Sequence, residues 1–236
     1  MKDKLTCDLT EKVTGIVESA ACPAFKAVTF VGDAVKSFQI ALEADPSWTP
    51  ALLGAAIALS EEDPPQAIAA AKKALQLNPS YVDAHVFLAH QALDQDKKDE
   101  AREALQKAIG VSPSSLEAHS ALAAIAYVED KKSEFEADVA TVLAIAPTYG
   151  EVYRVAGGLA GRNYRFEEAV TLLKKSLELR PQEPRALSDL GANLLRTGDE
   201  PAARRALDAA FKLDPYHAPT FNMLGLLDTL DTFITV

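Results

Sequence analysis

Apolar residues recur every three or four positions along most of the chain, a spacing that places their side chains on one face of a helix. In the middle of the chain one such stripe occupies residues 82–93 and a second occupies residues 99–111. Between them the polar run DQDKK at 94–98 has nothing to bury and predicts a turn. Residues 80–113 therefore predict a helical hairpin, whose apolar stripes stay exposed unless the hairpin stacks on copies of itself.

Prolines divide the chain into units of nearly constant length. The prolines that close these units are Pro46, Pro79, Pro113, Pro147, Pro181 and Pro215. The intervals between them are 33, 34, 34, 34 and 34 residues. Because proline cannot continue a helix and restricts the residue before it, we expect six second helices that each end within about two residues of these prolines.

A two-helix unit that repeats every 34 residues resembles the tetratricopeptide repeat (TPR) family, in its bacterial type. The positions that carry the resemblance best are Leu187, Leu190, Gly191, Leu194, Ala203, Leu207 and Pro215. The resemblance implies an all-α fold, namely a right-handed superhelical solenoid of stacked antiparallel helix hairpins. One unit departs from the family pattern, because Phe135 stands where the family has a small alanine.

The pattern divides the chain into three parts. Residues 1–33 are the least regular and predict an N-terminal cap with a degenerate first helix. Residues 34–215 predict the TPR array, with about six repeats. Residues 216–236 predict a closing helix and then a strand-like alternation from Asp231 onward, which we interpret as the start of a truncated segment.

Charge and motifs narrow the functional classes. The net charge of −10 argues against a nucleic-acid partner, since phosphate binding needs a basic surface. No apolar run reaches the roughly 20 residues of a membrane span. The N-terminal residues lack the apolar core of a signal peptide, so we expect a cytoplasmic protein, while a trimmed N-terminus leaves a periplasmic or secreted location open. Without a known catalytic or metal-binding motif, we expect no enzyme activity, no cofactor and no metal.

The family resemblance implies that the first helix of each hairpin lines a concave groove. Four arginines of this acidic chain fall at groove positions, and Gly158 leaves the groove floor bare between two of them. Because a guanidinium matches a carboxylate with two hydrogen bonds, we expect an anion or an acidic peptide to bind there. The residues that we assign to this groove are His90, Tyr127, Arg154, Gly158, Arg162, Arg185 and Arg196.

Local roles compete with this interpretation. The arginines can instead be solvated side chains that pair with neighbours such as Glu151 and Asp189. Thr148 with Glu151, and Ser114 with Glu117, have the spacing of a capping box at the start of a first helix.

We therefore expect a scaffold that binds a protein or peptide, with an acidic segment as the candidate ligand. Two alternatives stay open. The array can be the non-catalytic N-terminal arm of a longer, peptidase-like enzyme, or it can be a structural spacer or self-assembly module. The sequence leaves the oligomeric state open.

Overall fold

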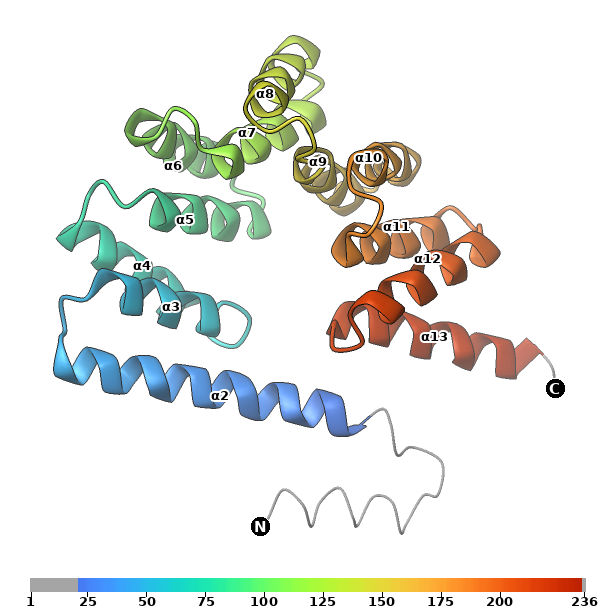
Figure 1. Ribbon diagram of the computed structural model, residues 1–236, viewed down its shortest axis with the longest axis horizontal. Coiled ribbons are helices and arrows are strands. Elements are labelled where there is room, and N and C mark those ends of the chain that lie inside the picture. The colour runs from blue at the N-terminus through green and yellow to red at the C-terminus, as the bar shows by residue number, and fades with distance from the viewer. Residues whose placement is uncertain (1–20, 235–236) are drawn as a thin grey trace. The chain divides into compact units, whose positions relative to one another are not determined.

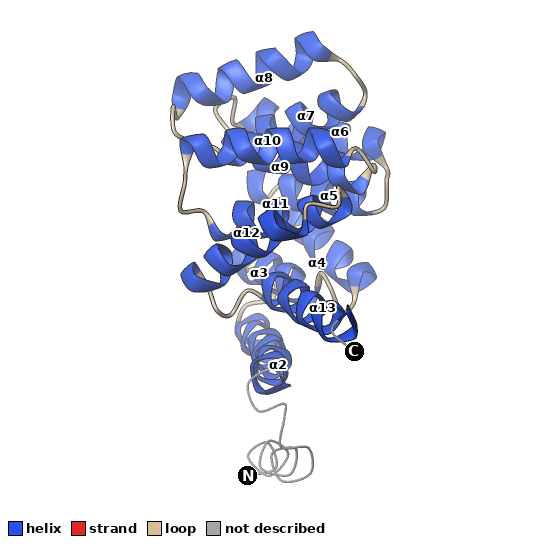
Figure 2. Cartoon of the chain, turned by 90° about the vertical axis from the view of Figure 1, so that its right-hand side faces the viewer, coloured by secondary structure: helices blue, strands red, loops and turns tan. Residues whose placement is uncertain are grey.

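The computed structural model describes residues 21–234, and within that range all regular structure is helical (Figure 1, Figure 2). The first of two compact units, Met1–Pro79, contains α2 (Ala21–Ala44), α3 (Thr49–Leu59) and α4 (Pro64–Leu77). The second, Ser80–Val236, contains α5 (Val82–Asp94), α6 (Lys98–Val111), α7 (Leu116–Val128), α8 (Lys132–Ile145), α9 (Glu151–Arg162), α10 (Phe166–Leu179), α11 (Pro184–Arg196), α12 (Glu200–Leu213) and α13 (Ala218–Ile234). The all-α repeat architecture that the sequence predicts is thereby confirmed.

The prolines end the second helices as expected. The helices α2, α4, α6, α8, α10 and α12 each end two residues before the proline that closes the unit. In the turn that follows, the backbone N–H after the helix donates to a carbonyl four residues earlier, as Asn78 donates to Ala74 at 2.8 Å. The 34-residue period therefore sets the register of every hairpin in the array.

A second period, which the sequence analysis missed, lies in the turn inside each hairpin of the Ser80–Val236 unit. The residues with positive φ are Asp96 (57°), Asp130 (59°), Tyr164 (61°) and Gly198 (84°), each 34 residues after the last. This left-handed conformation ends the first helix, because it lets the next N–H donate backward to a free carbonyl. Arg165 N, for example, donates to the carbonyl of Ala160 at 3.0 Å. Aspartate and glycine adopt the conformation readily, whereas tyrosine rarely does.

Small residues allow the two helices of each hairpin to approach closely. Gly191 of α11 faces Leu207 of α12, and a Cβ at Gly191 would lie 2.5 Å from Leu207 Cγ. Gly157 of α9 stands in the same relation to Leu173 of α10, at 2.9 Å. Both leucines are fully buried, so in each of these two hairpins a leucine of the second helix fills the space beside a glycine of the first.

The first helices of the second unit contact one another in succession, α5 with α7, α7 with α9, α9 with α11 and α11 with α13. The second helices pack mainly on their own hairpin partners and lie on the outside of this row (Figure 1). We call the face of the inner row the first-helix side.

The junction around α7 departs from the regular stack. Elsewhere in the second unit each new first helix packs mainly on the preceding second helix, as α11 does on α10. Here α9 packs directly and extensively on α7, while α8 packs mainly on α7 (Figure 1). Phe135 at the start of α8 explains part of the difference. Its ring lies edge-on between Tyr127 of α7 and Tyr153 of α9, with centroids 5.0 and 6.5 Å away.

Some local expectations were wrong. Residues 231–234 continue helix α13 and form no strand. The cap of α7 is Ser115, whose hydroxyl accepts from Ala118 N at 3.3 Å, so a simple serine cap one residue later replaces the capping box expected at Ser114. No side chain caps α9, because its N-cap residue is Gly150, and the expected box partner Glu151 accepts from Arg154 instead. Helix α2 runs unbroken across position 33, and the degenerate first helix expected before it lies outside the described residues.

Among the described residues, no helix combines the length and the apolar character that a membrane crossing requires.

Candidate functional site

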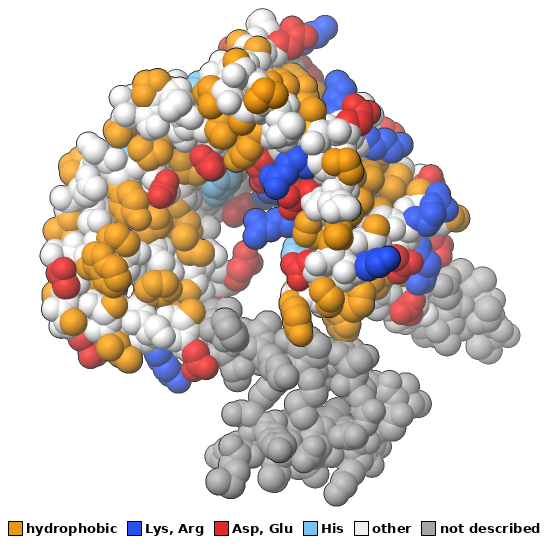
Figure 3. All heavy atoms as spheres, viewed as in Figure 1, with side chains coloured by type: hydrophobic (Ala, Val, Ile, Leu, Met, Phe, Trp, Pro, Cys, Tyr) orange, Lys and Arg blue, Asp and Glu red, His pale blue; other side chains and the backbone are white. Residues whose placement is uncertain are grey.

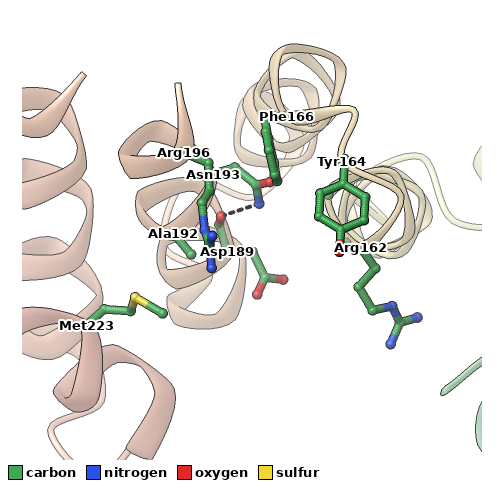
Figure 4. Close-up of a pocket in the computed structure, with 10 residues that line it drawn as sticks. Arg162, Tyr164, Phe166, Asp189, Ala192, Asn193, Arg196 and Met223 are labelled. Atoms are coloured by element: carbon green, nitrogen blue, oxygen red, sulfur yellow. Dashed lines mark hydrogen bonds between the residues drawn. The ribbon is translucent and has the colours of Figure 1, made fainter. Parts of the chain in front are cut away.

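A hollow of about 400 Å³ opens between α9 and α11, the first helices of two successive hairpins, and the closing helix α13 (Figure 4). Its lining residues are Gly158, Gly161, Arg162, Tyr164, Phe166, Asp189, Ala192, Asn193, Arg196 and Met223. Three of the residues predicted for the groove meet here, namely Gly158, Arg162 and Arg196. The hollow therefore brings together part of the predicted site with aromatic residues that the sequence analysis did not select.

Two glycines of α9 shape the floor of the hollow. A Cβ at Gly158 would meet no atom within 4 Å, so this position faces open space as predicted. A Cβ at Gly161 would lie 2.5 Å from Oδ1 of Asn193, so this glycine allows α11 to approach. The Asn193 side chain is held in turn, since its Nδ2 donates to the Asp189 carbonyl at 2.8 Å (Figure 4). The floor thus consists of the α9 backbone at these glycines and the side-chain amide of Asn193, which its hydrogen bond holds in place.

Two aromatic rings border the hollow at the turn between α9 and α10. Tyr164 is 82% exposed and holds the left-handed conformation with φ of 61°. Its ring meets Phe166 edge-on, with centroids 6.0 Å apart and an interplanar angle of 78°. The same left-handed conformation ends the first helix at the equivalent turns, and here it falls on an aromatic residue. Tyr164 therefore exposes its ring at the border of the hollow.

The positive charge of Arg154 is paired with two carboxylates of the protein itself. Its Nε donates to Glu151 at 2.7 Å, and its Nη1 donates to Asp189 of α11 at 2.8 Å. Burial works to lower the pKa of Arg154, but the hydrogen bonds and charges of Glu151 and Asp189 outweigh it and raise the pKa above the ordinary value. With a side chain only 21% exposed, Arg154 joins α9 to α11. This is the local pairing that the sequence left open as an alternative.

Arg162 reaches across the first-helix side. Its Nη1 lies 2.6 Å from Oδ1 of Asp94, at the end of α5, 68 residues earlier in the chain. Both side chains are 53% exposed. Figure 4 shows the Arg162 guanidinium extended away from Arg196 and Asp189. Arg162 therefore lines the hollow while its guanidinium is paired with Asp94.

Arg196 and Arg185 are both exposed on α11 and form no ion pair with the side chains that the structure describes, those of residues 32–229. Arg196 lines the hollow, whereas Arg185 lies in the first turn of α11 and is not part of its lining. Arg196 is thus the cation of the hollow that is available to a ligand. The space-filling view shows that other basic side chains in the region of α9–α12 lie beside acidic ones (Figure 3).

His90 and Tyr127 lie outside the lining of the hollow. Burial lowers the pKa of His90, and the charges of Arg162 and Arg154 act in the same direction against Asp94 and Glu151. Tyr127 donates its hydroxyl to Glu168 at 2.9 Å, and burial with that hydrogen bond raises its pKa to about 12. Arg165 lies over the Tyr127 ring at 5.2 Å from its centroid. Tyr127 therefore joins helices rather than facing a ligand.

Sequence reasoning missed Tyr164, Phe166, Asn193 and Met223. The 34-residue register was a usable signal for Tyr164, since the equivalent turn positions hold Asp96, Asp130 and Gly198. An aromatic residue at a position that otherwise holds aspartate or glycine is out of pattern. Nothing in the local sequence indicates the other three.

Comparisons with known proteins agree with this architecture. The TPR repeat-containing protein PA4299 of Pseudomonas aeruginosa is 40% identical over 78 residues, which are 33% of this chain and 32% of that protein. The chain thus matches about a third of the length of that curated relative. The Cut9–Hcn1 hetero-tetramer of the APC/C has a TM-score of 0.57 at 17% identity, covering 96% of this chain and 46% of that chain. YrrB, a TPR protein with an unusual peptide-binding site, has a TM-score of 0.48 at 18% identity. That match covers 80% of this chain and 98% of the YrrB chain.

The structural likenesses concern the fold alone, and the family assignment comes from the sequence match. The Tetratricopeptide repeat family model matches residues 58–125 and 162–223, which together are more than half of the 236 residues. The chain therefore belongs to the tetratricopeptide repeat family.

Proposed function

We propose that this chain is a scaffold that binds a protein or peptide partner on the first-helix side of the Ser80–Val236 unit, and that it acts by binding rather than by catalysis. Protein interaction is the role typical of the tetratricopeptide repeat family. The observation that carries the proposal is the hollow between α9, α11 and α13, because it combines an available cation with exposed aromatic surface.

The hollow suits an acidic segment with a neighbouring apolar side chain. Arg196 can bind a carboxylate through two parallel hydrogen bonds. Tyr164, Phe166 and Met223 supply apolar surface beside it. The one carboxylate in the lining, Asp189, already accepts from Arg154 at 2.8 Å, so it opposes an incoming anion less than a free carboxylate would. An acidic peptide therefore fits this site better than a basic one does, although the whole chain is acidic.

The proposal is tested by fluorescence anisotropy with a labelled hexaglutamate peptide and a hexaglutamine peptide as the uncharged comparison. We expect hexaglutamate to bind, and added salt to weaken its binding. Arg196→Gln should raise the dissociation constant about two- to fivefold, because an exposed ion pair contributes up to about 1 kcal/mol.

Arg205→Gln is the matched control. Arg205 is exposed on the second helix α12, outside the hollow, and its loss changes the net charge by the same amount. Arg205→Gln should leave the dissociation constant close to that of the wild type. Equal effects of the two substitutions would show that only the net charge matters, and the hollow would lose its assignment.

A further inference from the structure

Resting on the proposed function, we propose that Asp94 is a built-in competitor for the acidic partner, because it holds Arg162 away from the hollow in the free protein. An acidic partner that occupies the hollow then draws Arg162 from Asp94. Asp94 thereby sets the affinity of a site that it does not line.

The position of Arg162 carries the inference. Arg162 belongs to the lining of the hollow, yet its guanidinium extends away from Arg196 toward Asp94 (Figure 4). Rotation about its side-chain bonds is all that is needed to turn the guanidinium toward the hollow, since an arginine has several rotatable bonds. With Arg162 and Arg196 together, two cations would flank one bound segment.

The contact between Asp94 and Arg162 depends on the irregular junction at α7. Asp94 ends α5 and Arg162 ends α9, and the whole α7–α8 hairpin lies between them in sequence. Between them α9 packs directly on α7, and α7 in turn contacts α5. The Asp94–Arg162 pair is therefore a feature of this chain's departure from the regular repeat.

The energetics make the pair easy to displace. Both partners are 53% exposed, and exposed ion pairs contribute little to stability because water screens them and two side chains lose freedom. A ligand carboxylate that also contacts Arg196 gains a second cation that Asp94 cannot reach. The Arg154 pair behaves differently, because two carboxylates and burial hold it in place. Of these two arginines, Arg162 is therefore the one poised for exchange between an internal and an external carboxylate.

The test compares two neighbouring aspartates with the same labelled hexaglutamate peptide. Asp94→Asn should lower its dissociation constant about two- to fivefold, the range that the weakness of an exposed pair allows. Asp96→Asn is the matched control, since Asp96 is an exposed carboxylate two residues away that pairs with Lys98 at 2.6 Å. It changes the net charge equally and should not produce this gain.

A double-mutant cycle then assigns the gain to Arg162. In an Arg162→Gln background, Asp94→Asn should give no further tightening, because the arginine that it releases is absent. If Asp94→Asn and Asp96→Asn give the same dissociation constant, or if the gain persists without Arg162, the inference is overturned while the binding site stands. If hexaglutamate binds neither the wild type nor any variant, or binds Arg196→Gln as well as the wild type, the proposed function fails and this inference fails with it.

Discussion

The ring of Phe135 meets the ring of Tyr127 edge-on, with centroids 5.0 Å apart and an interplanar angle of 64°. Phe135 occupies a position where the repeat pattern favours alanine, so the family pattern alone treats it as a misfit. In this structure the ring fills the space between α7 and α9 instead. Phe135 thus marks both the place where the sequence departs from the repeat pattern and the place where the helix packing departs from the regular stack.

Phe135→Ala should destabilise the protein, although it restores the residue typical of the family. We expect the free energy of unfolding to fall by about 2 kcal/mol, since a fully buried Phe→Ala change costs about 3–5 kcal/mol and this ring is half-buried. Chemical denaturation of the two proteins measures the difference. A variant as stable as the wild type, or more stable, would show that the ring does not hold the α7 junction.

Two glycine substitutions should change the free energy of unfolding in opposite directions. Gly191→Leu should lower the free energy of unfolding by about 1–3 kcal/mol, because even a Cβ there would lie 2.5 Å from Leu207 Cγ. Gly158→Ala should raise it by about 0.5–1 kcal/mol, because a Cβ there meets nothing and alanine favours the helix. Denaturation midpoints give both values. An unchanged midpoint for Gly191→Leu would mean that the hairpin is not closed at this position.

Much of the fold follows from the sequence because its determinants are local. Pro79 and the other closing prolines end helices by chain geometry alone, so the hairpins and their register are readable without a structure. The hollow was readable only in part. Gly158, Arg162 and Arg196 share a helical register, but Met223 joins them only through the stacking of α13 on α11. The Asp94–Arg162 pair, 68 residues apart, depends on how α9 packs on α7, which no local pattern encodes.

Tyr164→Asn should separate stability from binding. Asparagine adopts positive φ more readily than tyrosine, so the substitution should raise the free energy of unfolding by about 0.5–1 kcal/mol. It should also weaken hexaglutamate binding, because the exposed ring at the border of the hollow is lost. Denaturation and anisotropy on the same preparation measure both effects. A variant that is less stable, or that binds as the wild type does, would contradict the role given to Tyr164.

Stability should depend on pH through His90. Burial lowers its pKa in the folded protein, while in the unfolded chain the pKa is about 6.5. As the pH falls below about 6.5, the unfolded chain therefore takes up a proton that the folded protein resists, and the free energy of unfolding decreases. His90→Gln should lose this part of the decrease. Denaturation of both proteins on either side of that pH tests it, and an identical pH dependence would contradict the assignment.

The occupancy of the hollow can be observed directly through Met223. The chain contains two methionines, Met1 and Met223, so a protein labelled with ¹³C at the methionine methyl groups reports the hollow with one signal and the N-terminus with the other. Titration with hexaglutamate should shift the Met223 signal with the dissociation constant found by anisotropy, and Arg196→Gln should reduce that shift at equal peptide concentration. A Met223 signal that stays in place while the peptide saturates the protein would contradict binding in the hollow between α9, α11 and α13.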